Sequence, residues 1–189
     1  LTPMPYGGTD ENGDRRFSAI ENFIQNFDGG EDEYTYWSMV RFKTTARQVQ
    51  PFTNDRDAFY NFITDQHSRS STLDAGFTNY QSALDQAIDL IQQDVAASKA
   101  ADPQISSSYI MFFVSDGAPV VGVTPAGEPV RQADADLEDS VKRFFALQEQ
   151  ESEFIEGMQL NTAYYYEEQS DPSAIGTLQL MADTGKGSF

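Results

Sequence analysis

The longest unbroken apolar run in the chain covers residues 109–114, which read Tyr-Ile-Met-Phe-Phe-Val and leave no polar face. A strand without a polar face is typical of the centre of a parallel sheet that is covered by helices on both sides. The run stops at Ser115-Asp116-Gly117, where a short acid and a glycine favour a turn. The pattern therefore predicts a central strand whose carboxyl end carries Asp116, at the edge where open α/β sheets bind ligands.

Apolar residues at helical or alternating spacing predict the other elements. We expect helices at residues 15–27 with Asp14 as N-cap, 55–66, 79–101, 134–150 and 173–183, and strands at 34–44, 46–50 and 158–166. Pro51 is expected to close the second of these strands, and residues 1–14, 67–77 and 120–132 are expected to be loops. Strands that alternate with helices predict a doubly wound, mostly parallel α/β sheet with one antiparallel edge strand, in a single domain of residues 1–189.

The composition limits the classes of partner. Thirty acidic against twelve basic residues give a formal charge of −18, which disfavours nucleic acid because phosphate binding needs clustered Lys and Arg. The first explanation of this acidity is solubility. The absence of cysteine excludes disulfides, thiolate nucleophiles and zinc–thiolate sites. No apolar run is as long as a membrane span and no signal-peptide pattern is visible, so we expect no direct insertion into a membrane; the sequence predicts no oligomeric state.

Two positions carry candidate chemistry. Asp116 follows the central strand, and Thr78 stands just before the long helix at residues 79–101. Each has an ordinary explanation: a turn acid can bond to its own backbone, and Thr is a good helix N-cap. However, a doubly wound sheet would bring both loops to one edge.

Five motifs, taken in order, resemble the von Willebrand factor A domain family over nearly the whole chain. The matches are Arg15 to Phe27, Val40-Arg41-Phe42, Gly76-Phe77-Thr78, Phe113-Val114-Ser115-Asp116-Gly117 and Met181-Ala182-Asp183-Thr184-Gly185. Two are imperfect, because the family places a small residue where Lys43 stands and a second glycine where Lys186 stands.

This resemblance implies a metal-ion-dependent adhesion site. In that family a cation is held by an Asp-x-Ser-x-Ser motif, a threonine and an aspartate; by motif position Thr78 would be the threonine and Asp116 the aspartate. Mg²⁺ is the implied cofactor, with Mn²⁺ or Ca²⁺ possible, since hydroxyls and carboxylates are hard oxygen ligands. The implied function is non-enzymatic: cation-dependent adhesion to a protein partner that presents an Asp or Glu, at an extracellular or cell-surface location.

The chain departs from the family at one motif, since it contains no Asp-x-Ser-x-Ser. In the family that motif ends the first central strand, and a sheet without this strand leaves backbone groups unpaired. We therefore expect the strand to come from preceding residues or from another chain.

Three other interpretations remain. The missing serines favour a metal-free scaffold or structural subunit, and Asp116 could serve a metal-assisted hydrolase, although no Gly-rich phosphate loop is present. A catalytic triad around His67 lacks a nucleophile elbow, so His67 is expected to be an exposed loop residue. The cluster at residues 164–166 is explained by strand propensity rather than by a binding surface.

Overall fold

The computed structural model describes residues 14–27, 34–69, 77–101, 103–165 and 171–189 of the 189-residue chain. In these residues the elements follow in the order α1 Asp14–Asn26, β1 Trp37–Phe42, β2 Ala46–Thr53, α2 Arg56–Ser68, α3 Tyr80–Ala100, β3 Ser107–Ser115, β4 Val120–Val123, β5 Pro129–Arg131, α4 Asp134–Gln150, β6 Ile155–Tyr164 and α5 Pro172–Thr184. No helix among these described segments is both long enough and apolar enough to cross a bilayer.

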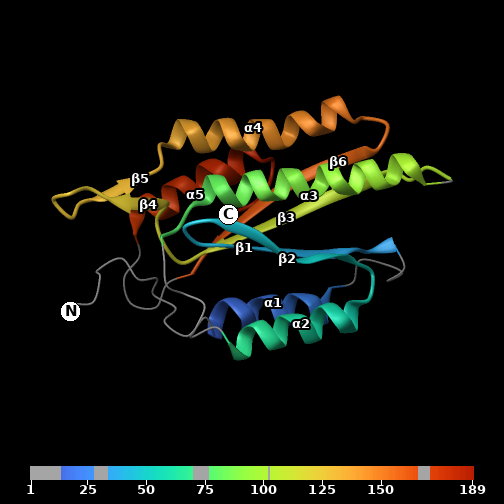
Figure 1. The fold of residues 1–189 in the computed structure, drawn as a ribbon, viewed down its shortest axis with the longest axis horizontal. Helices are drawn as coiled ribbons and strands as arrows, with labels where there is room; N and C mark the ends of the chain where they lie inside the picture. Colours follow the sequence, from blue (N-terminus) through green and yellow to red (C-terminus); the bar gives the residue numbers. More distant parts are fainter. Residues whose placement is uncertain (1–13, 28–33, 70–76, 102, 166–170) are drawn as a thin grey trace.

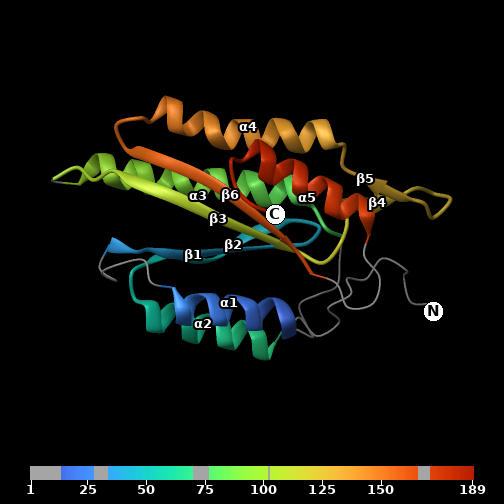
Figure 2. The same ribbon diagram turned by 180° about the vertical axis from the view of Figure 1, so that it is seen from behind.

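The strands lie between two layers of helices. Helices α1 and α2 form one layer, and α3, α4 and α5 form the other (Figure 1). Figure 2, seen from behind, shows the same arrangement with β3 and β6 nearer the viewer. The carboxyl ends of β1, β3 and β6 lie at the same end of the molecule, beside the β4–β5 hairpin (Figures 1 and 2). We call this end the carboxyl rim.

The mixed α/β class is confirmed, but the continuous doubly wound sheet is not seen. Within the described residues the strands form three two-stranded sheets: β1 with β2 and β4 with β5 are antiparallel, and β3 with β6 is parallel. β1 and β3 are not hydrogen-bonded to each other. The described residues form no complete sheet, and the expectation that a central strand comes from preceding residues or from another chain stays a prediction.

The core follows the apolar stripes of the helices. One buried cluster joins α3 to β3, β6, α4 and α5, and contains Tyr80, Ala83, Leu84, Phe113, Leu137, Val141, Leu160, Leu178 and Met181. A separate cluster joins α1 and α2 and contains Phe17, Ile24, Phe59 and Ile63, with Trp37 and Met39 of β1 packed against it. The two helical layers therefore have separate cores, with the strands between them.

Most predicted elements are confirmed within a few residues, but three local expectations about them are wrong. Asp14 is the first residue of α1 rather than its cap. β2 continues through Pro51 to Thr53, because Pro51 sits where the register with β1 shifts and its missing amide donor is tolerated. Residues 120–132 contain a short hairpin instead of a structureless loop. Residues 1–13 and 70–76 lie outside the described residues, so the loops expected there are not assessed, and the same holds for Gly76 of the third motif and for Tyr166 at the expected end of the last strand.

His67 is also placed differently from the expectation. It belongs to α2, its ring stacks on Phe17 at 5.6 Å, and its Nδ1 lies 3.2 Å from Glu21 Oε1. Helix α2 ends at Ser68, two residues beyond the expected end, so His67 lies on the face that contacts α1. It is a packing residue between two helices, and not an exposed loop histidine.

A pair of glycines gives a direct test of the packing at the end of the chain. A Cβ placed on Gly187 would lie 1.9 Å from the Leu160 carbonyl oxygen, whereas one placed on Gly176, inside α5, would meet nothing within 4 Å. We expect Gly187→Ala to lower the free energy of unfolding by about 1–3 kcal/mol through overpacking. The matched change Gly176→Ala should raise it by about 0.5–1 kcal/mol through helix propensity. Urea denaturation measures both, and equal effects would contradict the close approach of residue 187 to β6.

Candidate functional site

The first turn of α3 is bonded to two separate loops at the carboxyl rim. Asn79 is the N-cap: its side-chain oxygen accepts from the Ser82 amide at 2.9 Å. Its own amide donates to the Lys43 carbonyl at 2.9 Å, in the turn between β1 and β2. The Thr78 amide donates to the Val120 carbonyl at 2.8 Å, at the start of β4. These bonds hold the segment before α3 between the two loops.

Gln132 adds a further connection to the same turn. Its side-chain oxygen accepts from the Tyr80 amide at 2.8 Å, and its side-chain nitrogen donates to Asn79 Oδ1 at 2.9 Å. Its backbone amide donates to the Pro119 carbonyl at 2.8 Å. The residue thus satisfies a free donor of the helix start and fixes the base of the β4–β5 hairpin.

The loop after β3 approaches Thr78 closely. A Cβ placed on Gly117 would lie 3.4 Å from Thr78 Oγ1, so the threonine hydroxyl lies next to the residue that follows Asp116. Because Asn79 is the cap, the capping explanation of Thr78 is wrong. No hydrogen bond to Thr78 Oγ1 is found within the described part of the chain.

Tyr80 and Ser115 fix the turn that carries Asp116. The fully buried Tyr80 donates its hydroxyl to the Gly117 carbonyl at 2.6 Å, and Ser115 Oγ donates to the same carbonyl at 3.2 Å. Burial, followed by the charge of Asp116, raises the pKa of Tyr80 far above its usual value, so its hydroxyl stays a donor. The turn therefore has two side-chain supports: Ser115, which stands in the matched motif but was given no role there, and Tyr80, which lies outside the matches.

Asp116 itself has a basic neighbour. Its Oδ2 lies 3.9 Å from Arg16 Nη1 of α1, and the two side chains are 14% and 22% exposed. Thr78 and Asp116 thus stand on adjacent loops, but the described residues contain no cluster of three or more His, Asp or Glu side chains that could hold a metal ion. The pair supplies two donors of the right kind, hydroxyl and carboxylate, next to one competing guanidinium.

Sequence reasoning missed three residues of this rim. Tyr80 could have been found, because it begins the apolar stripe that continues with Ala83 and Leu84. Arg16 lies within the matched stretch Arg15 to Phe27 but was given no role there, and Gln132 fell in an expected loop. Only the folded arrangement brings the two residues to the rim.

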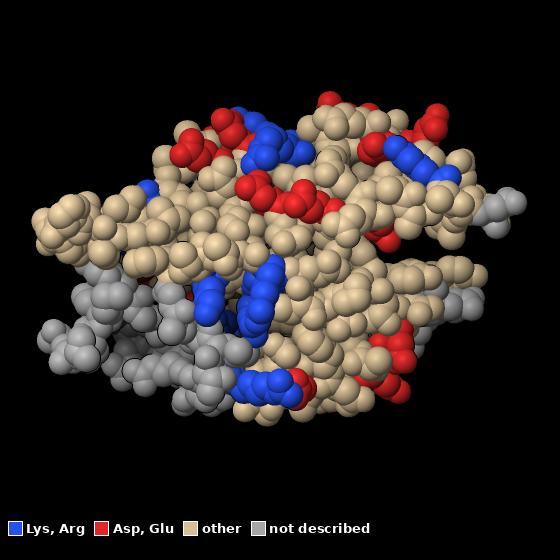
Figure 3. Space-filling view, in the orientation of Figure 1, with Lys and Arg blue, Asp and Glu red and all other residues tan. Residues whose placement is uncertain are grey.

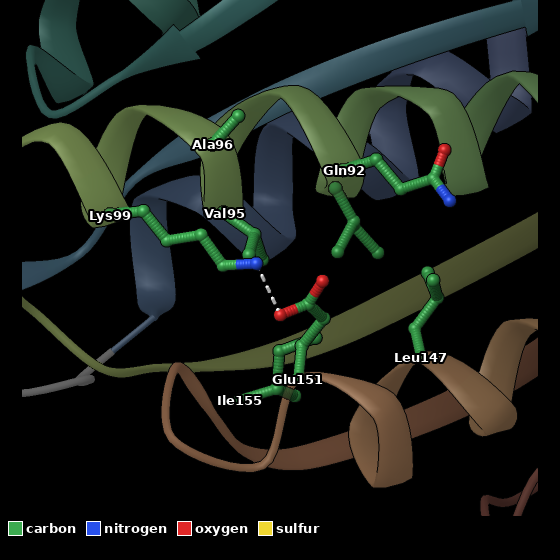
Figure 4. A pocket seen from close by; sticks show the side chains of 8 residues that line it. Gln92, Val95, Ala96, Lys99, Leu147, Glu151 and Ile155 are labelled. Atoms are coloured by element: carbon green, nitrogen blue, oxygen red, sulfur yellow. Dashed lines mark ion pairs between the residues drawn. The ribbon is translucent and has the colours of Figure 1, made fainter.

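Away from the rim, a hollow lies between α3 and α4. It has a volume of about 230 Å³ and is lined mainly by apolar side chains, with an ion pair at its mouth between Lys99 Nζ and Glu151 Oε2 at 2.6 Å (Figure 4). Figure 3 shows acidic and basic side chains interspersed over the upper part of the view, where α3 and α4 lie. The hollow contains no grouping of donors comparable with the carboxyl rim.

Comparisons with known proteins give only distant similarities. No protein-family model and no curated protein matches the chain. An aerotolerance-related membrane protein from Bacteroides fragilis, crystallised with multiple mutations to serines, superposes with a TM-score of 0.49 at 15% identity, over 92% of this chain and 77% of that one. The conserved hypothetical protein BatB from Bacteroides thetaiotaomicron gives 0.44 at 15% identity, over 92% and 76%.

Tyr80→Phe tests the support of the Asp116 turn. Losing the bond to the Gly117 carbonyl should lower the free energy of unfolding by about 1–2 kcal/mol at neutral pH. The folded-state pKa is raised, so this stabilisation is present below the unfolded pKa of about 10 and is lost as the pH rises above it. The difference between wild type and variant, measured in urea, should therefore shrink above about pH 10.

The matched control is Tyr36→Phe, which removes a hydroxyl from a side chain that is 58% exposed. It should change stability by less than about 0.5 kcal/mol. If the two variants behave alike at all pH values, Tyr80 does not support the turn.

Proposed function

We propose that this chain is a non-enzymatic protein-binding domain that uses its carboxyl rim, and that a hard divalent cation at Thr78 and Asp116 contacts an acidic side chain of the partner. The observation that carries the proposal is the approach of the Thr78 hydroxyl to Gly117, which brings two oxygen donors from distant parts of the sequence onto adjacent loops. Neither donor is used to cap α3.

The donors fit Mg²⁺ in kind. Mg²⁺ retains several waters in proteins and is commonly held by one or two carboxylates, so a hydroxyl and a carboxylate fit its needs as ligands from the protein. A bound cation would supply positive charge, which a chain of net charge −18 needs in order to attract a carboxylate. Tyr80 and Ser115 would hold the Asp116 turn in place while Asn79 and Gln132 hold Thr78.

A metal-free binding or scaffold domain is the second candidate, and the Arg16–Asp116 contact favours it. A guanidinium beside the carboxylate supplies the positive charge that a cation would otherwise provide. In that case Arg16 and Asp116 are a structural pair linking α1 to the turn after β3. The two candidates make opposite predictions for Arg16.

The cation proposal is tested by thermal unfolding in MgCl₂, MnCl₂ and CaCl₂ against EDTA. At one hundred times the dissociation constant, a cation that binds only the folded state adds about 2.7 kcal/mol, so the melting temperature should rise. Thr78→Ala and Asp116→Asn should remove the rise, and Arg16→Gln should enlarge it by removing a competing charge. A peptide array in which each Asp or Glu has an Asn or Gln counterpart should then bind with Mg²⁺ and not with EDTA.

Two control variants make the same kinds of substitution at positions outside the proposed cation site. Thr45→Ala changes an exposed threonine in the β1–β2 turn, and Asp139→Asn changes an exposed acid of α4; both should keep the cation effect. If no cation shifts the wild type and Arg16→Gln lowers stability as much as Asp116→Asn does, the metal-free candidate is correct.

A further inference from the structure

The β1–β2 sheet carries positive charge in a chain whose net charge is −18. Residues 34–54 contain no Asp or Glu, although the whole chain has thirty, and they include Arg41, Lys43 and Arg47. We call these three side chains, at the turn between the strands, the basic turn. Figure 3 shows basic side chains close together at the level of the β1–β2 sheet, in contrast to the mixed charges over α3 and α4. A local positive surface on an acidic protein favours contact with an anionic partner.

Two charges of the basic turn have no acid beside them. Other cations of the described residues lie within 4 Å of an Asp or Glu oxygen: Arg16, Arg69, Lys99, Arg131, Lys142 and Arg143. In the same described segments no carboxylate lies that close to Lys43 or Arg47, and both side chains are exposed. The charges of these two residues are therefore left to solvent or to a partner.

The strand register adds a cost to this arrangement. Arg41 and Arg47 stand directly opposite each other across the antiparallel pair. Phe42 and Ala46 pack against the core cluster under α3, so the alternation of side chains puts both arginines on the other face of the sheet. Like charges directly opposite one another destabilise a sheet. A costly pair of charges at the surface indicates a binding role, since a carboxylate from a partner would remove the repulsion.

The basic turn adjoins the proposed cation site. The Lys43 carbonyl accepts from the Asn79 amide at 2.9 Å, and Thr44 Oγ1 accepts from the Phe77 amide at 3.1 Å. The side-chain nitrogen of Asn79 also donates to the Thr44 carbonyl at 3.2 Å. Thr78 lies between the two residues that make these bonds. The basic turn and Thr78 are thus held on adjacent backbone segments at the carboxyl rim.

We propose that the basic turn binds a second acidic side chain of the partner, so that the recognised segment is a short acidic stretch of a protein. The proposal rests on the proposed function for the first acidic side chain, which contacts the cation. Lys43 and Arg47 would contact the second carboxylate. An extended chain covers about 3.3–3.6 Å per residue, so acids about two to four residues apart would reach neighbouring loops. Linking two contacts in one segment raises affinity above that of either contact alone.

The probes are short Gly–Ser peptides with one Glu, or with a second Glu at increasing separation from the first. Fluorescence anisotropy with an uncharged dye measures their dissociation constants in MgCl₂. At the best separation the second Glu should tighten binding about tenfold, and a Gln in its place should not. The double variant Lys43→Gln/Arg47→Gln should lose this gain. Its melting temperature should be unchanged or higher, because the repulsion from Arg41 is relieved, so lost binding is distinct from unfolding.

The matched control is Lys142→Gln/Arg143→Gln, which changes the net charge equally on α4 and should keep the tenfold gain. If both double variants behave alike, or if the second Glu adds nothing in the wild type, the proposal is overturned. Aggregation of Lys43→Gln/Arg47→Gln without loss of the gain assigns the charges to protection of the β2 edge and also overturns it.

Failure of the cation site is recognised separately. If Mg²⁺ changes the binding of no peptide, the cation proposal fails, and the same comparison is made in EDTA. There the peptide with two Glu must still prefer the wild type to Lys43→Gln/Arg47→Gln. Equal binding, or no binding to either protein, overturns the role of the basic turn.

Discussion

The arrangement of this molecule depends on the first turn of α3. Three backbone amides there, of residues 78–80, donate to the β1–β2 turn, to the start of β4 and to Gln132 at the end of the β4–β5 hairpin. The Tyr80 hydroxyl adds a bond to the turn after β3. The free amides of a helix start need partners, and here the partners come from loops far apart in the sequence. Satisfying one helix terminus therefore assembles the carboxyl rim.

Helix α3 also holds the β1–β2 sheet against the β3–β6 sheet. Its buried stripe packs on the core below β3, and its contacts with β1 and β2 hold the other sheet on the same side. Without hydrogen bonds between β1 and β3, side-chain packing under α3 is the main connection between them. Packing constrains the position of a strand less than a hydrogen-bond ladder does. We therefore expect the relative position of β1 and β3 to be the least rigid part of the strand geometry.

The sequence predicted what depends on local pattern. Helical spacing located α3 and α4 almost to the residue, and the run at 109–114 identified β3. It also identified Asp116 and Thr78 as loop residues at strand and helix ends, and the fold places these loops side by side. Pairing between strands could not be predicted in this way, because period and propensity do not specify partners. Arg16, which adds a charge to the rim, is visible only when α1 has its place.

The acidity of the chain sets the electrostatic condition for any acidic partner at the rim. Among the described residues Arg16 is the cation within 4 Å of Asp116, and in a chain of net charge −18 an added positive charge would strengthen the attraction of an acidic partner to the rim. How firmly Asp116 is positioned depends on β3, which in the described residues pairs with β6 alone, and on the two hydroxyls that bond to the Gly117 carbonyl. Because one of these hydroxyls belongs to Tyr80, the helix start that joins the loops of the rim also fixes the turn at Asp116.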